Sequence, residues 1–176
     1  MLLLYATSLL IYLKGFKMEL KELIELYDLQ PHPEGGYFKE SYRAETKTST
    51  PNGERNSSTA IYFLIPVGKK SALHRIASDE VWHFYLGAPL KIIQISPDGI
   101  LSQVILGQDL KAGHKLQHVV PAGYWFGAIS MNDRDYSFVG CTVAPGFDFN
   151  DFEIGQRSKL NEMFPHAKNI IELLTD

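Results

Sequence analysis

The stretch HRIASDEVWHFYLG, from His74 to Gly87, contains three side chains suited to chemistry, namely His74, Glu80 and His83. Imidazoles bind first-row divalent metals and exchange protons near neutral pH, and a neighbouring carboxylate fixes their tautomer. The stretch therefore fits a divalent metal site built from these three residues. It equally fits an acid–base pair in which His74 is the catalytic base and Glu80 orients it. A third alternative is structural, with a buried His74 that only hydrogen-bonds to Glu80.

The strands that carry these residues determine which of the side chains can lie close together. Residues 71–76 and 80–86 are expected to be strands joined by a tight turn, which returns Glu80 beside His74. Because side chains alternate along a strand, Glu80 and His83 point to opposite faces of a regular strand. Only a β-bulge could turn both of them into one pocket.

From residue 57 to residue 144 the chain alternates short apolar runs with glycine-containing turns, and no helical periodicity interrupts them. This pattern is typical of an antiparallel β-sandwich or barrel. Strands are expected over residues 37–44, 58–66, 71–76, 80–86, 90–96, 101–107, 116–120, 124–129 and 136–144. Residues 45–56 are expected to form a polar loop, and helices are expected over residues 18–28, 156–163 and 166–174. The sequence thus predicts an all-β fold with short N- and C-terminal helices.

The composition fits one domain that binds neither nucleic acid nor an anionic membrane. The 176 residues include 17 basic and 20 acidic side chains, a net charge of −3, so the chain lacks the basic field that binds nucleic acid or an anionic membrane. The single cysteine, Cys141, lies in the apolar run YSFVGCTVA, where a buried hydrophobic role is favoured over a nucleophilic one. A free thiol fits a reducing, cytoplasmic location.

The first 17 residues differ from the rest of the chain. They are almost wholly apolar as far as Leu13, a run too short to span a membrane. We expect natural translation to begin at Met18, which makes residues 1–17 an apolar extension and residues 18–176 a single domain. An anchor or signal-like segment is the alternative.

The motif spacing resembles that of the cupin superfamily. Gly68, His74, Glu80 and Gly87 match the first cupin motif, with Ile76 in place of its second histidine. The run Pro121-Ala122-Gly123-Tyr124-Trp125-Phe126 resembles the second motif, with Phe126 in place of the histidine and Ser130 in place of the asparagine. Metal-binding cupins use three histidines and the glutamate, so the resemblance leaves His74 and Glu80 as the remaining ligands.

Two further segments resemble one particular cupin family. They are PHPEGGYFKESYR at residues 31–43 and TVAPGFDFNDFE at residues 142–153, and together with the segment from His74 to Gly87 they are similar to the fifth numbered cupin family, a domain of unknown function. The resemblance implies a double-stranded β-helix, or jelly-roll barrel, that forms a homodimer. It also implies a fold-level similarity to cupin epimerases that act on deoxythymidine-diphosphate sugars.

Several aromatic and charged side chains are candidates for ligand contacts in such a barrel. Trp82, Trp125 and Phe126 either fill the core or form a flat wall that stacks on a sugar or base. The loop from His32 to Tyr37 either contacts a ligand with its polar residues or only directs the chain into its strand. The candidate ligand-binding residues are His83, Trp82, Tyr85, Trp125, Phe126, Glu40 and Arg43.

These residues lead to one preferred function and two alternatives. The preferred function is binding of a sugar-like or nucleotide-linked small molecule, with isomerase or epimerase activity. In this interpretation His74 is the base, Glu80 orients it, and Tyr37 or Tyr85 donates a proton. The alternatives are a metal-dependent dioxygenase or isomerase and a non-catalytic binding or storage module. A divalent metal held by His74, Glu80 and His83 is the one cofactor considered.

Overall fold

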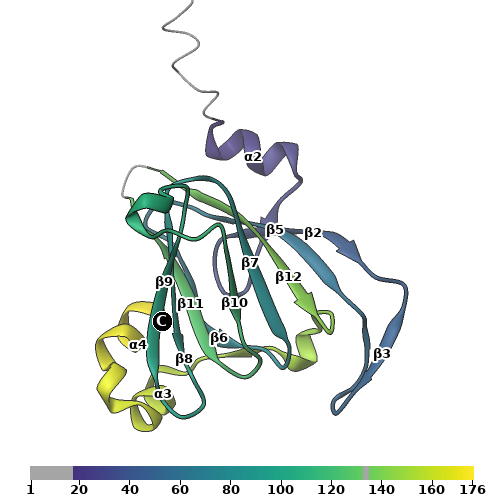
Figure 1. Ribbon diagram of the computed structural model, residues 1–176, viewed down its shortest axis with the longest axis vertical. Coiled ribbons are helices and arrows are strands. Elements are labelled where there is room, and N and C mark those ends of the chain that lie inside the picture. The colour runs from purple at the N-terminus through teal and green to yellow at the C-terminus, as the bar shows by residue number, and fades with distance from the viewer. Residues whose placement is uncertain (1–17, 133–134) are drawn as a thin grey trace, which may run out of the picture.

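The computed structural model describes residues 18–132 and 135–176, so the predicted extension at residues 1–17 lies outside the described residues. Two β-sheets face each other, and short helices lie outside them (Figure 1). One sheet has the strand order β1 (Gln30–Pro31), β2 (Tyr37–Arg43), β5 (Thr59–Ile65), β12 (Ser137–Ala144), β7 (Asp79–Gly87) and β10 (Gln117–Val120). The other has the order β13 (Glu153–Ile154), β6 (Lys70–Arg75), β11 (Trp125–Ser130), β8 (Leu90–Ile95) and β9 (Leu101–Leu106).

The predicted all-β jelly-roll architecture is confirmed. Every strand range predicted from the sequence overlaps an observed strand, and the ladders within both sheets are antiparallel. The two sheets pack as a sandwich and are not joined into one closed barrel among the described residues. None of the helices in the described part of the chain is long and apolar enough to cross a membrane.

Apolar side chains from the inner faces of both sheets form the main core. Trp82 of β7 and Phe126 of β11 are buried there, and their rings meet edge to face with centroids 6.3 Å apart. Phe63 of β5 packs edge-on against Trp82. These strands are apolar on one face and mixed on the other, which is why alternation predicted them well.

The helices cover the outer faces of the two sheets. The helices α3 (Arg157–Met163) and α4 (Lys168–Leu174), which are yellow in Figure 1, pack Leu160 and Ile171 against Trp125 on the five-stranded sheet. The helix α2 (Leu20–Leu26) packs Leu23 against Leu64 and Phe138 of the six-stranded sheet. Single-turn 3₁₀-helices occur at Leu110–Ala112, Phe149–Asp151 and Pro165–Ala167.

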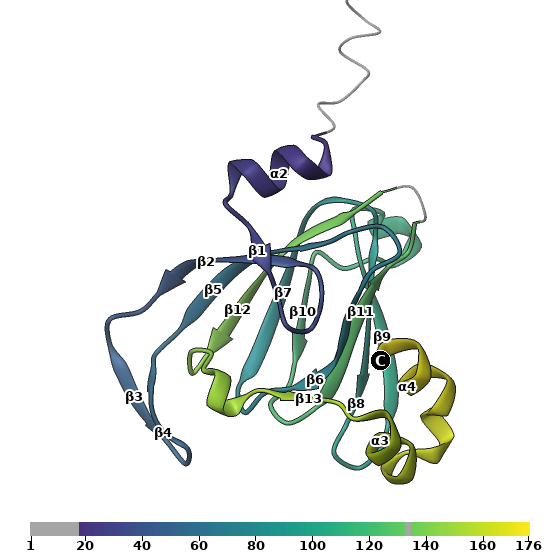
Figure 2. The ribbon, with the colours of Figure 1, turned by 180° about the vertical axis from the view of Figure 1, so that it is seen from behind.

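The prediction of a polar loop at residues 45–56 is wrong. These residues form a hairpin of β3 (Lys47–Thr50) and β4 (Gly53–Asn56) that extends away from the sandwich (Figure 2). Its side chains are polar on both faces, so it lacks the alternation that identifies a half-buried strand. The hairpin is joined to the rest of the molecule by a nearly buried ion pair, in which Arg55 Nε lies 2.6 Å from Asp151 Oδ2.

Candidate functional site

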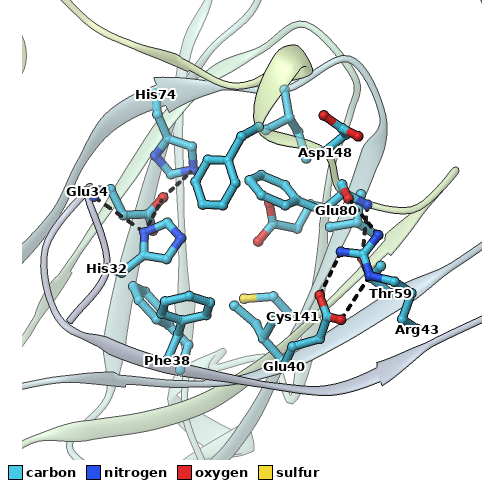
Figure 3. Close-up of a pocket in the computed structure, with 16 residues that line it drawn as sticks. His32, Glu34, Phe38, Glu40, Arg43, Thr59, His74, Glu80, Cys141 and Asp148 are labelled. Atoms are coloured by element: carbon cyan, nitrogen blue, oxygen red, sulfur yellow. Dashed lines mark hydrogen bonds and ion pairs between the residues drawn. The ribbon is translucent and has the colours of Figure 1, made fainter. Parts of the chain in front are cut away.

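A cavity of about 350 Å³ lies between the two sheets, enclosed by strands of both sheets and by two loops. Figure 3 shows its polar side chains converging from opposite walls. The lining residues are His32, Glu34, Phe38, Glu40, Arg43, Thr59, Ile61, Phe63, His74, Ile76, Glu80, Cys141, Val143, Phe147, Asp148 and Phe149. Ligand pockets range from about 300 to 1,000 Å³, so this cavity fits a compact small molecule.

An irregularity in β6 orients the histidine of the first motif. Phe126 of β11 pairs with His74, and Ala128 of β11 pairs with Ser71. These pairs are two residues apart on β11 and three apart on β6, so β6 carries one extra residue. Ser71 and His74 would point to opposite faces of a regular strand, and the extra residue turns both toward the interior. The sequence led us to consider a bulge between Glu80 and His83, but β7 is regular there and shifts register only farther on, between Phe84 and Leu86.

The loop before β2 places Glu34 beside these two residues. The Glu34 carbonyl oxygen accepts a hydrogen bond from the Ala72 backbone N–H at 2.8 Å, and Oε1 of Glu34 accepts one from the Ser71 hydroxyl at 2.8 Å. Gly35 makes this path possible, because it has a φ of +104° and a Cβ there would lie 2.3 Å from the Lys70 carbonyl oxygen. Gly35 thus directs the path of the loop, which was one of the two alternatives for residues 32–37.

The His74 ring has both nitrogens engaged. Nδ1 lies 2.7 Å from the Ala72 carbonyl oxygen, which can only accept, so Nδ1 carries a proton. Nε2 lies 3.1 Å from Oε2 of Glu34. Since neutral His74 then has a lone pair on Nε2, this contact holds a single proton, resident either on Nε2 or on Oε2. The arrangement is a buried acid–base pair.

His32 approaches the same carboxyl oxygen. Its Nδ1 accepts a hydrogen bond from the Glu34 backbone N–H at 3.3 Å and lies 3.5 Å from Oε2 of Glu34. Burial lowers the pKa of His32 and also that of His74, so both rings tend to be neutral. Burial raises the pKa of Glu34 to about 6, although His32 and the Ser71 hydroxyl oppose the shift. Burial thus disfavours the charged forms of Glu34 and of both imidazoles.

Glu80 is a second buried carboxyl in the cavity. Burial raises its pKa to about 7, a shift that His74 and the Cys141 thiol oppose and that Glu34 reinforces. Burial and the Glu80 charge raise the pKa of the Cys141 thiol well above its usual value, so Cys141 stays protonated. This favours the hydrophobic role predicted for the cysteine over a nucleophilic one. Glu80 lies across the cavity from Glu34 (Figure 3).

The third polar group is a charged pair at the rim. The Arg43 guanidinium donates from Nε and Nη2 to the two carboxylate oxygens of Glu40, at 2.9 Å and 2.7 Å. Strand alternation places Glu40 and Arg43 on opposite faces of β2, but the register shifts between Glu40 and Tyr42, so Glu40 is opposite Ile61 and Arg43 is opposite Thr59. All four of these side chains line the cavity.

The tyrosines and the second histidine that the sequence offered as site residues lie away from the cavity. Tyr37 packs on the outer side of the six-stranded sheet, in the cluster beneath α2. His83 bonds to Thr142 at 3.0 Å and Gln117 at 2.8 Å, and Tyr85 packs against Tyr62. The inner residues of β7 are Glu80, Trp82 and Phe84, as regular alternation requires. Their positions do not support Tyr37 or Tyr85 as proton donors to a ligand in this cavity.

The large aromatic candidates fill the cores. Trp82 and Phe126 belong to the inner core, with the Phe126 ring 4.1 Å from the His74 ring between centroids. Trp125 belongs to the core beneath the C-terminal helices, where the Arg75 guanidinium lies 4.7 Å from its ring centre. The stacking wall is instead formed by phenylalanines of the lining, such as Phe38 and Phe147.

The divalent metal site considered from the sequence is not assembled. His83 faces away from His74 and Glu80, and Ile76 and Phe126 stand where metal-binding cupins have histidines. No group of three or more His, Cys, Asp or Glu side chains within residues 18–132 and 135–176 is arranged to hold a metal ion. The residues present therefore do not fit this cofactor.

The sequence places Glu34 and His32 in a loop whose polar residues either contact a ligand or only direct the chain into its strand, and it does not single out either residue. Both lie in the segment at residues 31–43 that resembles the cupin family. Polar residues next to the glycines Gly35 and Gly36 were the sequence feature that could have identified them as site residues. Asp148 also lines the cavity, and its side chain caps the 3₁₀-turn by accepting from the Asn150 N–H at 2.9 Å.

Known proteins are similar to this chain in sequence and in fold. A model of the family described as Cupin superfamily (DUF985) matches residues 21–155. The uncharacterised protein YML079W of Saccharomyces cerevisiae is 31% identical over 150 residues, which cover 75% of this chain and 73% of that protein.

Two solved structures are similar over nearly their whole length. Protein SO0799 of Shewanella oneidensis has a TM-score of 0.84 and 39% identity, covering 91% of this chain and 99% of its own. A hypothetical protein of Leishmania major has a TM-score of 0.84 and 34% identity, covering 90% and 99%. The family match and these relatives together show that this chain belongs to the DUF985 family of the cupin superfamily.

Proposed function

We propose that this protein binds a compact, sugar-like small molecule between its sheets and transfers protons to and from it, as an isomerase or epimerase does. The observation that carries the proposal is the contact of 3.1 Å between His74 Nε2 and Glu34 Oε2, buried against a cavity. General acid–base catalysis is most effective when the pKa of the group lies near the working pH. The pKa of Glu34, which burial raises to about 6, lies close to a neutral working pH.

Glu80 supports the same chemistry from the opposite wall. An epimerase or isomerase removes a proton at one position and returns one at another position or face, so it benefits from two groups that exchange roles. The pKa of Glu80 is raised to about 7 and that of Glu34 to about 6, so each carboxyl exists in both protonation states near neutral pH. In this proposal Glu34, rather than Glu80, orients His74, and Glu80 acts as the second acid or base.

The size and charge of the cavity favour a sugar over a nucleotide-linked ligand. Its volume of about 350 Å³ is near the lower end for ligand pockets. Arg43 is the one arginine or lysine among its described lining residues, and Glu40 already binds it. A diphosphate would find little positive charge here. The homodimer and the cytoplasmic location remain predictions.

The test is hydrogen exchange at carbon. Aldoses, ketoses and nucleotide sugars would be screened by thermal shift, and those that bind would be incubated with the protein in D₂O. An isomerase or epimerase incorporates deuterium at the carbon it deprotonates, which NMR detects. Glu34→Gln and His74→Asn should each slow the exchange by about 100-fold or more.

The matched control is Glu162→Gln, on the exposed side of α3, which should exchange as fast as the wild type. Binding without deuterium incorporation would leave a non-catalytic binding module and refute the catalytic part of the proposal. Equal exchange rates in the wild type and in Glu34→Gln would refute the role of the acid–base pair.

A further inference from the structure

We infer that the cavity selects a ligand that carries a primary ammonium group, which specifies the ligand class of the function proposed above and rests on it. The first observation is the balance of charged groups around the cavity. Four carboxyl groups line it, from Glu34, Glu40, Glu80 and Asp148, against a single guanidinium, from Arg43, among the described lining residues. With neutral imidazoles, the lining carries an excess of negative charge. A cation is attracted to such a site and an anion is repelled.

The arginine does not offset this excess for a ligand. Its Nε and Nη2 bind Glu40, and its Nη1 donates to Asn56 Oδ1 at 2.9 Å and to the Phe147 carbonyl oxygen at 3.3 Å. Arg43 and Glu40 thus neutralise each other, and the donors of Arg43 are directed at the protein. Glu34 binds Ser71 and His74, and Asp148 accepts from the Asn150 N–H, so Glu80 is the lining carboxyl whose partner is weakest.

Glu80 is the group best suited to receive a cation. It is 7% exposed and lines the cavity, and the Cys141 thiol donates a hydrogen bond to its carboxyl. A thiol is a weak donor, whereas a carboxylate has about four acceptor sites. An ammonium group offers three strong donors, and charge-assisted hydrogen bonds are among the strongest in proteins. A ligand ammonium would satisfy acceptor sites of Glu80 that the protein leaves open.

The remaining walls suit the carbon skeleton next to such a group. Phe38, Phe63, Phe147 and Phe149 line the cavity, and the Phe147 and Phe149 rings lie edge to face with centroids 5.0 Å apart. Aromatic rings attract cations through their quadrupole and also pack against the C–H groups of a sugar ring. The cavity therefore combines buried carboxyls with aromatic walls.

Protonation gives the inference a second readout. The pKa of Glu80 is raised to about 7 because the carboxyl is buried, so part of it is protonated near neutral pH in the free protein. A bound ammonium stabilises the carboxylate and lowers this pKa. Binding of a cation near neutral pH should therefore release protons, whereas binding of a neutral molecule should not.

The test compares ligands that share a skeleton and differ in charge. Glucosamine, glucose and glucuronate form one set, and cyclohexylammonium, cyclohexanol and cyclohexanecarboxylate form another. Affinities would be measured by calorimetry in two buffers of different ionisation enthalpy, which reports the protons released. Each ammonium should bind at least about tenfold more tightly than its neutral counterpart, with proton release.

Variants separate the carboxyl from the general fold. Glu80→Gln keeps the shape of the side chain and should abolish both the preference for ammonium and the proton release, while Glu162→Gln should change neither. Circular dichroism would confirm that both variants are folded. Loss of binding of every probe, the neutral ones included, in a folded Glu80→Gln variant would count against the inference, because removing the charge should leave binding of the neutral probes unchanged.

The remaining outcomes overturn the inference. They are equal affinity for ammonium and hydroxyl probes, preference for the carboxylates, an ammonium preference that survives Glu80→Gln, and no binding of either ammonium. Deuterium incorporation into a neutral sugar would then still support the function proposed above. Conversely, ammonium-selective binding without any exchange would support this inference and refute catalysis, so the two failures are distinguishable.

Discussion

Oε2 of Glu34 lies 3.1 Å from Nε2 of His74, while Nδ1 of the same imidazole is held by a backbone carbonyl oxygen at 2.7 Å. The backbone contact fixes the tautomer, and the carboxyl contact makes the proton on Nε2 exchangeable. This resembles the use of a carboxylate to orient a histidine, with one difference: the carboxyl is itself buried and partly protonated. The pair is therefore one titrating unit.

Glu34→Gln should lower the pKa of His74 further below its usual value. The amide removes the carboxylate charge that stabilises the imidazolium, and its N–H₂ can donate to the Nε2 lone pair of the neutral ring. NMR titration of the imidazole nitrogens would check this, with His166 of the C-terminal 3₁₀-turn as an internal reference. An unchanged or higher pKa of His74 would mean that the contact of 3.1 Å does not control this ring.

Glu80→Gln should stabilise the protein at alkaline pH. The pKa of Glu80 is raised from 4.5 to about 7 in the folded state, so the folded protein retains a proton that the unfolded chain has released over this window. Wild-type stability therefore falls as the pH rises from about 4.5 to about 7, by at most about 3 kcal/mol from this group. The Glu80→Gln variant has no carboxyl at this position, so its stability does not fall with pH for this reason.

The free energy of unfolding would be measured in denaturant at several pH values. The advantage of Glu80→Gln should be near zero at the acid end of the window and largest above it, whereas Glu162→Gln should track the wild type throughout. An advantage that does not depend on pH would contradict the raised pKa of Glu80.

Gly35→Ala should destabilise the protein more than Gly113→Ala. Both glycines have positive φ, at +104° and +88°, and left-handed backbone costs a residue with a Cβ about 1–2 kcal/mol. A Cβ at Gly113 meets no atom within 4 Å, but one at Gly35 would lie 2.3 Å from the Lys70 carbonyl oxygen. We expect a total loss above about 2 kcal/mol for Gly35→Ala, with displacement of Glu34 from His74. Equal losses in denaturant unfolding would show that the loop tolerates the clash.

Asp151→Asn should lower the melting temperature more than Asp28→Asn. Asp151 forms a two-point pair with Arg55 in which both side chains are over nine-tenths buried, whereas the pair of Asp28 and Lys39 is exposed. Removing the carboxylate leaves the Arg55 charge buried without its partner. Because Arg55 lowers the pKa of Asp151, the stabilisation is present above the usual pKa of an aspartate and is lost as the pH falls through the lowered value.

The same variant should expose the β3–β4 hairpin to proteases, since Arg55 of β4 and Asn52 of the hairpin turn are both joined to Asp151. Limited proteolysis of Asp151→Asn and Asp28→Asn would compare them directly. Equal cleavage of the two variants would show that the ion pair does not hold the hairpin.

Local patterns predicted the fold and part of the site. Alternation predicted the strands, and the first-motif spacing led to His74 and Glu80, both of which line the cavity. Glu34 was not found because its position depends on a loop that returns to β6, a non-local contact made through the Ala72 N–H. Tyr37 was a candidate because a tyrosine can donate a proton, but its side chain lies on the outer face of β2, away from the cavity. Residue type thus identified candidates, and the pairing of distant strands selected among them.

The extra residue at Ser41 of β2 has a consequence for related chains. It separates Glu40, which is opposite Ile61, from Arg43, which is opposite Thr59, so that both reach the rim, while Tyr42 is turned outward. A regular strand over the same residues would instead turn Tyr42 toward the rim and Arg43 outward, without any substitution. Loss of this bulge is therefore a route by which members of one family could diverge in ligand preference. An alignment that scores only residue identity would miss such a change.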